Sequence, residues 1–317
     1  MHRGGSVRAA KLRCMQEPRV YPGRGVRMGS GQYLASPVNR PGKPKALGFL
    51  DAIRKCKLMM KKLILWILSR LGYSLQKYNP NATKHINDDF VDIREQEFWD
   101  VYEFCKPYTM TSIERMYSLY VSVDYILSNN IPGAFVECGV WRGGSAMLIA
   151  KMLVNRAIYD RKIYLYDTFE GMSEPTSDDI TWNGDSASTL LDATKNSKED
   201  SVWCLASMIT VKTNLALTNY NEDNIHYIEG KVEDTLPATL PDEGIALLRL
   251  DTDWYESTKH ELKHLFPKVV QCGVLIVDDY GHWEGSRKAT DEYFQETNTP
   301  ILLNRIDYTG RVAIKPG

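Results

Sequence analysis

Two short apolar runs, Ile245–Leu250 and Val274–Val277, stand out in the second half of the chain, and aspartates follow each of them directly. Between the runs, residues 255–269 carry apolar side chains at three- and four-residue spacing, which predicts an amphipathic helix. A strand, a helix and a strand in this order predict a parallel pair of strands. The carboxyl ends of the two strands then meet at one edge of the sheet, where open parallel sheets bind ligands.

The same alternation of strand-like and helix-like patterns continues on both sides of this unit, so we expect an α/β domain with a mostly parallel sheet. Further strands are predicted at residues 134–138, 162–166 and 225–229, and a closing hairpin at 301–306 and 311–314. Further helices are predicted at residues 88–104, 112–128, 146–154, 201–217 and 285–294. Residues 173–200 are polar and lack periodicity, which indicates either a surface insertion or a lid that carries Trp182.

The aspartates after the two apolar runs are the first sign of chemistry. Asp251 and Asp253 follow the first run, and Asp278 and Asp279 follow the second. Side by side at neighbouring strand ends, these carboxylates form an oxygen-rich pocket suited to Mg²⁺ or another hard divalent cation. Asp251-Thr252-Asp253 is also a D-x-D triplet, so a metal-dependent glycosyltransferase that holds a nucleotide sugar is an alternative.

A glycine-rich turn joins the strand at 134–138 to the following helix. Its pattern is E-x-G-x-x-x-G-G, with Glu137 two residues before Gly139. It differs from the G-x-G-x-x-G pattern that places a pyrophosphate at a helix N-terminus. A carboxylate at this point suits S-adenosylmethionine, which has an α-amino group and a sulfonium but no phosphate. The candidate cofactor-binding residues in this turn are Glu137, Gly139, Arg142, Gly143 and Ser145.

A second cofactor signal lies at the end of the next predicted strand. Asp167 closes that strand about 20–30 residues after the glycines, the place where an acidic residue usually holds a ribose diol. Phe169 follows directly and is expected beside the same cofactor. Polar groups at the end of the strand at 225–229, namely Gly230, Glu233 and Asp234, are candidates for adenine recognition.

Charge divides the chain into a basic head and an acidic body. Residues 1–77 hold 17 Lys and Arg against two acidic residues, whereas the remainder carries a net charge of −16. We expect residues 1–45 to be disordered, residues 46–84 to form a basic helix and linker, and residues 85–317 to be the catalytic domain. An acid-poor N-terminus is also typical of a transit peptide, and an upstream translation start is a further explanation.

Residues 47–73 have the pattern of a basic amphipathic helix, which predicts either peripheral contact with an anionic membrane or packing on protein. The longest apolar run there is too short to span a bilayer. Six scattered cysteines without a C-x-x-C pair indicate a reduced, cytoplasmic chain, and Cys138 and Cys272 are expected in the core. We expect a homo-oligomer and no nucleic-acid partner.

Several stretches of the chain together resemble the macrocin O-methyltransferase family, metal-dependent enzymes that methylate sugars of antibiotics. The resemblance covers residues 85–300, and the stretches that carry it are Tyr108–Ser112, Val136–Ser145, Tyr166–Met172, Gly230–Pro237, Leu248–Asp251, Tyr255–Ser257 and Val277–Gly281. It implies a Rossmann-like class I methyltransferase fold with helices on both faces of the sheet. It also implies transfer from S-adenosylmethionine to a hydroxyl acceptor, cofactor contacts at Met110 and Thr111, and Mg²⁺ on Asp251, Asp278 and Asp279.

A sugar hydroxyl is a weak nucleophile, so the reaction needs a group that accepts its proton. Asp251 is the first candidate for this base because it lies at the expected metal, and Asp253 and His282 are the alternatives. A non-catalytic protein that keeps the fold is a further alternative to an enzyme. Such a protein is expected to have lost acids or glycines of the site, and this chain retains them.

Overall fold

The computed structural model describes residues 89–194 and 203–317. All of these residues belong to one compact unit that spans residues 85–317. The predictions made for residues 1–45 and 46–84, including the amphipathic helix at 47–73, lie outside the described residues. Within the described residues, no helix combines the length and the apolar character that a bilayer-spanning segment needs.

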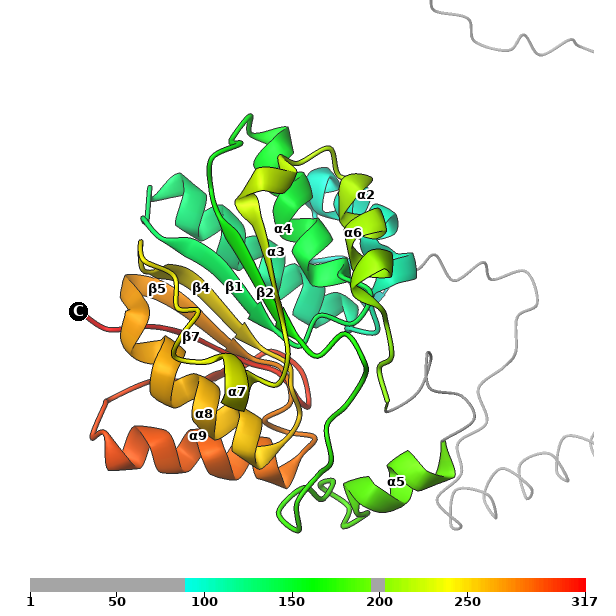
Figure 1. The fold of residues 1–317 in the computed structure, drawn as a ribbon. Coiled ribbons are helices and arrows are strands. Elements are labelled where there is room, and N and C mark those ends of the chain that lie inside the picture. The colour runs from blue at the N-terminus through cyan, green and yellow to red at the C-terminus, as the bar shows by residue number, and fades with distance from the viewer. Residues whose placement is uncertain (1–88, 195–202) are drawn as a thin grey trace, which may run out of the picture. The chain divides into compact units, whose positions relative to one another are not determined.

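A seven-stranded sheet with the order β3-β2-β1-β4-β5-β7-β6 forms the centre of the fold (Figure 1). The first five strands are parallel, and the last two continue the sheet in antiparallel fashion as the predicted C-terminal hairpin. The strands are β1 Ala134–Cys138, β2 Ile163–Asp167, β3 Ile225–Glu229, β4 Ile245–Leu250, β5 Val269–Val277, β6 Asn304–Arg305 and β7 Arg311–Ile314.

Helices cover both faces of the sheet, as expected of a Rossmann-like fold. One face packs against α2 Gln96–Cys105, α3 Ile113–Ser128, α4 Gly144–Asn155 and α6 Met208–Ala216. The other face packs against α7 Val232–Thr235, α8 Tyr255–Leu265 and α9 Glu284–Glu296. Short 3-10 helices are present at Lys106–Tyr108, Glu222–Asn224 and Phe266–Lys268.

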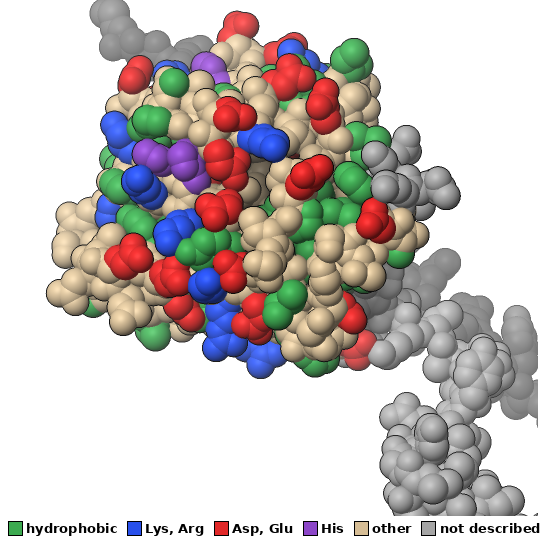
Figure 2. All heavy atoms as spheres, turned by 60° about the horizontal axis from the view of Figure 1, so that its bottom comes forward, with side chains coloured by type: hydrophobic (Ala, Val, Ile, Leu, Met, Phe, Trp, Pro, Cys, Tyr) green, Lys and Arg blue, Asp and Glu red, His purple; other side chains and the backbone are tan. Residues whose placement is uncertain are grey.

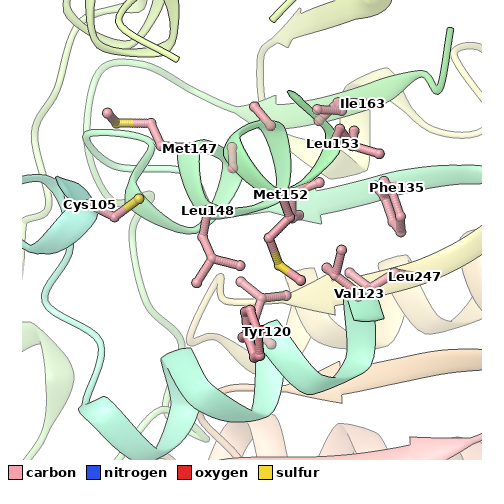
Figure 3. Packing of buried hydrophobic residues seen from close by; sticks show 14 of the residues in the cluster. Cys105, Tyr120, Val123, Phe135, Met147, Leu148, Met152, Leu153, Ile163 and Leu247 are labelled. Carbon is pink, nitrogen blue, oxygen red and sulfur yellow. The ribbon is translucent and has the colours of Figure 1, made fainter. Parts of the chain in front are cut away.

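The larger core lies around α4, a helix whose sequence is almost entirely apolar. Met147, Leu148, Met152 and Leu153 are fully buried. In Figure 3, Leu148 and Met152 point from α4 toward Tyr120 and Val123 of α3, and Leu153 lies near Ile163 of β2. A helix that is apolar on every side needs protein on every side. The crowded position of α4 fixes the glycine turn at its N-terminus.

The order of the strands reverses between β1 and β4. From β1 the chain proceeds outward through β2 and β3, and then returns to add β4 and β5 on the other side. The carboxyl ends of β1 and β4 therefore lie next to each other, and the Asp251 amide donates a hydrogen bond of 2.9 Å to the Cys138 carbonyl. Such a switch point leaves a crevice in which α/β proteins bind ligands.

The structure differs from the sequence prediction in a few elements. Helix α6 begins at Met208 and not at residue 201, because the Ser207 side chain accepts a hydrogen bond from the Thr210 amide and caps it there. Residues 173–194 are not entirely irregular, since they contain the short helix α5 Ala187–Ala193. The predicted strand at 274–277 begins earlier, at Val269.

The prediction that Cys272 lies in the core is wrong. Pairing between β4 and β5 is irregular, because Ile245 pairs with Val269 whereas Leu247 pairs with Val274. The additional residues of β5 bulge outward, and Cys272 has a left-handed backbone (φ 62°) with an exposed side chain. Cys138, in contrast, is buried as expected.

Candidate functional site

A cavity of about 220 Å³ opens at the switch point, at the carboxyl ends of the parallel strands. It is bounded by the stretch before α3, the glycine turn, the ends of β1, β2, β3 and β4, and the aspartates after β5. Predicted site residues that line it are Met110, Thr111, Glu137, Gly139, Ser145, Asp167, Gly230, Glu233, Asp251, Asp253, Asp278 and Asp279. Carboxylates that are far apart in the sequence thus share one cavity with the glycine turn.

The glycine turn approaches neighbouring backbone too closely for any side chain. Gly139 has φ 80°, and a Cβ placed on it would overlap the carbonyl oxygen of Asp251. A Cβ on Gly144 would lie 2.6 Å from the Thr109 side chain. These glycines allow β1, β4 and the stretch before α3 to converge on the cavity, as expected where backbone has to approach a ligand.

Asp167 connects the end of β2 to the glycine turn. One carboxylate oxygen accepts hydrogen bonds from the amides of Val140 (2.6 Å) and Trp141 (3.3 Å), and the other accepts one from Phe169 (2.7 Å). Burial raises the pKa of Asp167, and the three amides act in the opposite direction. The side chain therefore shapes the wall of the cavity in addition to lining it.

The end of β3 forms a further wall of the cavity. Gly230, Lys231, Val232 and Glu233 line it. The Ser257 hydroxyl donates a hydrogen bond of 2.8 Å to Glu233. This bond ties the wall to α8 and fixes the carboxylate that faces the cavity.

Arg249 is the centre of the acidic half of the cavity. Arg249 is a residue of β4 with an almost completely buried side chain. It donates hydrogen bonds to Glu137 (2.7 Å), Asp251 (2.7 Å) and Asp278 (2.8 Å). A second arginine, Arg115 of α3, also binds Asp278. One buried guanidinium thus holds the ends of three neighbouring strands in register.

The two arginines do not neutralise this half of the cavity. Five carboxylates lie there, those of Glu137, Asp251, Asp253, Asp278 and Asp279. Burial raises the pKa of Glu137 to about 7 and that of Asp278 to about 6, although Arg249 opposes both shifts. For Asp251 burial also acts to raise the pKa, but Arg249 and Arg115 outweigh it and lower the pKa. The cluster therefore holds more acids than arginines, and a bound cation would replace the protons that several of these acids retain.

Asp251, Asp278 and Asp279 are arranged as a candidate metal centre. Each offers an oxygen, and the three oxygens lie within 4.8 Å of one another. Asp279 is buried, and its Oδ2 atom has no hydrogen-bond partner among the described residues. A buried carboxylate oxygen without a donor fits a cation ligand, because leaving it unsatisfied is costly.

Asp253 lies beside this trio in a strained backbone conformation. Its φ is 66°, in the left-handed region that residues other than glycine rarely adopt. Asp279 and Trp283 lie beside its carboxylate, and both act to lower its pKa. Burial, reinforced by the charge of Asp251, raises the pKa of Asp253 to about 7. Backbone strain of this kind is concentrated at functional sites.

Five of the predicted site residues do not line the cavity, namely Arg142, Gly143, Phe169, Asp234 and His282. Arg142 stacks on the ring of Trp141, 4.7 Å from its centroid, and Phe169 is buried in the core. Gly143 provides the left-handed N-cap of α4, while Asp234 lies in the single turn of α7. His282 points toward the C-terminal hairpin, where its Nδ1 atom lies 3.2 Å from the Tyr308 hydroxyl.

The sequence prediction missed the two arginines of the cavity. For Arg249 a signal was present, since it is the only charged residue in the apolar strand Ile245–Leu250. A charge in a strand buried on both faces needs carboxylate partners. Arg115 follows the cap residue of α3 by three positions, which is an ordinary surface position of a helix. Only the tertiary structure brings it to Asp278.

Comparison with known proteins agrees with this geometry. Residues 72–314 match the family described as Macrocin-O-methyltransferase (TylF). Demethyldecarbamoylnovobiocin O-methyltransferase of Streptomyces niveus is 33% identical over 64% of this chain and 74% of its own length. Mycinamicin III 3''-O-methyltransferase of Micromonospora griseorubida is 31% identical over 64% of this chain and 76% of its own.

A solved structure, that of the O-methyltransferase NovP, is similar to the chain with a TM-score of 0.58. It is 30% identical and covers 66% of this chain and 83% of its own. The family match favours methyl transfer over the glycosyltransferase and over the non-catalytic alternative. The chain belongs to the macrocin-O-methyltransferase family and is an O-methyltransferase.

Proposed function

We propose that the enzyme transfers the methyl group of S-adenosylmethionine to a sugar hydroxyl of a glycosylated metabolite or a polysaccharide, with a divalent cation, Mg²⁺ in the first place, at the acceptor. The observation that carries the proposal is the continuity of one cavity between the glycine turn and the acidic cluster. A donor bound at the turn and an acceptor bound at the aspartates would then face each other across it.

The glycine-turn half of the cavity is the proposed cofactor site. Glu137 faces it with an Oε2 atom that is buried and has no hydrogen-bond partner among the described residues, which suits an α-amino group. The wall at Gly230–Glu233 would receive the adenosine together with Asp167 and Ser145. The negative charge of the cluster favours a sulfonium donor and disfavours a phosphate-bearing one.

The acidic half is the proposed metal and acceptor site. Asp251, Asp278 and Asp279 would hold the cation, because their oxygens converge and that of Asp279 lacks a donor. A divalent cation at this point lowers the pKa of a hydroxyl and orients it. Arg249 and Arg115 would keep two of the ligands in place through the bonds they already make.

Asp251 and Asp253 are the proposed candidates for the base that takes the hydroxyl proton. Asp251 is already bonded to Arg249 at 2.7 Å, an interaction that makes a carboxylate a weaker base. Asp253 faces the same cavity, and its pair with Asp279 brings two acids together without an intervening arginine. The contacts therefore favour Asp253, with Asp251 as the alternative, and place His282 last because it lies outside the cavity lining.

The sugar acceptor is proposed from the relatives. Their names describe methylation within glycosylated antibiotics, including a 2,3-dimethoxy-α-L-rhamnosyl group in a Streptomyces olivaceus enzyme that is 30% identical. The chain covers about three quarters of the length of these relatives. Membership of the family supports the same class of reaction for this chain, but it does not identify the individual sugar.

The test is transfer of a labelled methyl group from S-adenosylmethionine to a panel of glycosides by the full chain. We expect methyl glycosides to be labelled by the wild type in the presence of Mg²⁺. Asp278→Asn and Asp279→Asn should lose at least about a hundredfold in rate because each removes a charged ligand, while binding of S-adenosylmethionine remains. Unchanged transfer by both variants would contradict the assignment of the metal and acceptor site.

A further inference from the structure

The turn of the C-terminal hairpin lies beside the loop that follows β5. In the antiparallel pair of β5 and β7, Arg311 is opposite Val277, the last residue of β5. Residues 306–310, which form the hairpin turn between β6 and β7, therefore continue past the end of β5. The Thr309 hydroxyl donates a hydrogen bond of 2.8 Å to the Asp278 carbonyl. The hairpin turn is thus in contact with one of the proposed metal ligands.

Two glycines allow the hairpin turn to pack closely on both sides. The Gly281 amide donates a hydrogen bond of 2.9 Å to the Thr309 carbonyl, and a Cβ on Gly281 would overlap the carbonyl oxygen of Tyr308. A Cβ on Gly310 would lie 3.1 Å from the Cγ and Cδ atoms of Arg115. The hairpin turn is therefore held between the loop after β5 and the Arg115 side chain.

Asp307 connects the hairpin turn to α3. Its Oδ1 atom accepts hydrogen bonds from the amides of Thr309 (2.9 Å) and Gly310 (2.7 Å). Its Oδ2 atom accepts one of 2.9 Å from the Ser112 hydroxyl and lies 3.2 Å from the Nε atom of Arg115. Burial acts to raise the pKa of Asp307, but these hydrogen bonds and the arginine outweigh it and lower the pKa. Asp307 therefore faces Arg115 as a carboxylate.

The ion pair between Asp307 and Arg115 differs from those on the surface. On the face that carries α8 and α9, acidic and basic side chains are mixed (Figure 2), and a pair such as Lys259 and Glu292 is 38% and 34% exposed. The side chains of Arg115 and Asp307 are only 16% and 11% exposed. Exposed pairs contribute little to stability, whereas a buried charge that loses its partner is strongly disfavoured. We therefore expect Asp307 to determine where the Arg115 guanidinium lies.

Arg115 lies between two acids, Asp307 and Asp278. Its Nη1 atom binds the Asp278 carboxylate. Its Nε atom makes no hydrogen bond among the described residues, so its contact with Asp307 is purely an ion pair. Without Asp307, the positive charge of Arg115 would be left to Asp278 alone. The guanidinium would then compete more strongly with a cation for that carboxylate.

We propose that Asp307 is a positioning residue of the proposed metal site. By binding Arg115 from the side of the hairpin turn, it balances part of the positive charge of the arginine and leaves Asp278 available to the cation. This inference rests on the proposed function, because Asp307 has this role only if Asp278 holds a metal. Partners behind the ligands of a metal typically change its affinity by about 10–100-fold.

The test measures binding of Mn²⁺, as a probe for the divalent cation, to the full chain by electron paramagnetic resonance. Asp307→Asn keeps an oxygen for the amides of the hairpin turn and removes the charge that faces Arg115. We expect it to bind Mn²⁺ about tenfold more weakly than the wild type. The Mg²⁺ concentration for half-maximal methyl transfer should rise by the same factor. The kcat at saturating Mg²⁺ and the affinity for S-adenosylmethionine should stay unchanged.

A double-mutant cycle tests whether Asp307 acts through the arginine. In the background of Arg115→Gln, Asp307→Asn should have no further effect on the affinity for Mn²⁺, because the side chain that it positions is gone. Glu292→Gln is the matched control, since it removes one negative charge from an exposed ion pair. This control should bind Mn²⁺ like the wild type.

Two outcomes would overturn the inference while leaving the proposed function intact. One is an unchanged affinity of Asp307→Asn for Mn²⁺. The other is a loss in the double variant that equals the sum of the two single losses, which would mean that Asp307 does not act through Arg115. If Asp279→Asn binds Mn²⁺ as tightly as the wild type, the proposed metal site is wrong and the inference fails with it.

Discussion

Glu261 is a buried acid behind the site. It lies on α8 with no exposed surface, and its Oε2 atom accepts a hydrogen bond of 3.1 Å from the Thr252 hydroxyl. Its Oε1 atom has no partner among the described residues. Burial raises the pKa of Glu261 well above its ordinary value, and the bond from Thr252 opposes this shift. The side chain is therefore expected to be neutral, holding the middle residue of the Asp251–Asp253 turn.

The first prediction concerns Glu261→Gln and the dependence of stability on pH. An acid with a raised pKa in the folded state binds its proton more tightly there than in the unfolded chain. The free energy of unfolding then falls as pH rises from the unfolded pKa toward the folded one. The amide keeps the neutral hydrogen bonding but does not titrate, so the variant should gain stability relative to wild type between about pH 5 and pH 8.

Denaturant unfolding at the two pH values measures this difference. Glu256→Gln is the matched control, because Glu256 is exposed on the same helix and should give no such gain. An identical pH dependence for wild type and Glu261→Gln would show that Glu261 is ionised in the folded protein.

At the scale of elements, the shape of the cavity depends on the contact between the carboxyl ends of β1 and β4. The Asp251 amide bonds to Cys138, and Gly139 fits against the Asp251 carbonyl. Any side chain at residue 139 would push the two strand ends apart. The glycine turn proposed for the cofactor follows β1, and Asp251, one of the proposed metal ligands, follows β4, so the two would then separate.

The second prediction concerns Gly139, which lies at the contact between β1 and β4. Gly139→Ala should lower the free energy of unfolding by about 3 kcal/mol or more, because it combines a left-handed backbone with overlap of a neighbouring strand. It should also abolish binding of S-adenosylmethionine, measured by calorimetry. Gly184→Ala separates the two effects, since Gly184 has a φ of 93° but nothing within 4 Å of an added Cβ. That variant should lose only about 1–2 kcal/mol and still bind the cofactor.

Local patterns were sufficient to predict most elements of the fold. β1, β3 and β4 have the predicted bounds, since each is a short β-prone segment between residues that end strands, such as Gly133 and Gly139 around β1. The start of α6 and the bulge at Cys272 were missed, because a side-chain cap and an irregular strand pairing decide them. Neither the cap nor the irregular pairing produces a hydrophobic periodicity that could be recognised in the sequence.

The candidate site was predictable to the extent that strand ends determine it. The acids after β4 and β5 and the glycine turn after β1 converge because parallel strands end at one edge. Arg115 was not predictable, since a long-range contact brings it to Asp278. Arg142 and His282 were predicted in the cavity but lie outside its lining, where Arg142 lies over the Trp141 ring and His282 meets the Trp283 ring edge to face.

At the scale of the whole molecule, the proposed function gives one acidic cavity two tasks, holding a cationic methyl donor and activating an acceptor. The acidic cluster has five carboxylates and two arginines, so its charge favours cations in both halves. Calcium, magnesium and manganese all suit such oxygen ligands. We therefore expect methyl transfer to require a divalent cation, and donor binding not to require one.

The measurement that tests this most directly is removal and return of the metal, with transfer and donor binding followed in the same samples. We predict that EDTA abolishes methyl transfer to the glycoside, that added Mg²⁺ restores it, and that the affinity for S-adenosylmethionine changes by less than about threefold. Asp279→Asn should show no restoration at the same Mg²⁺ concentration. Full methyl transfer by the wild type in EDTA would contradict the account.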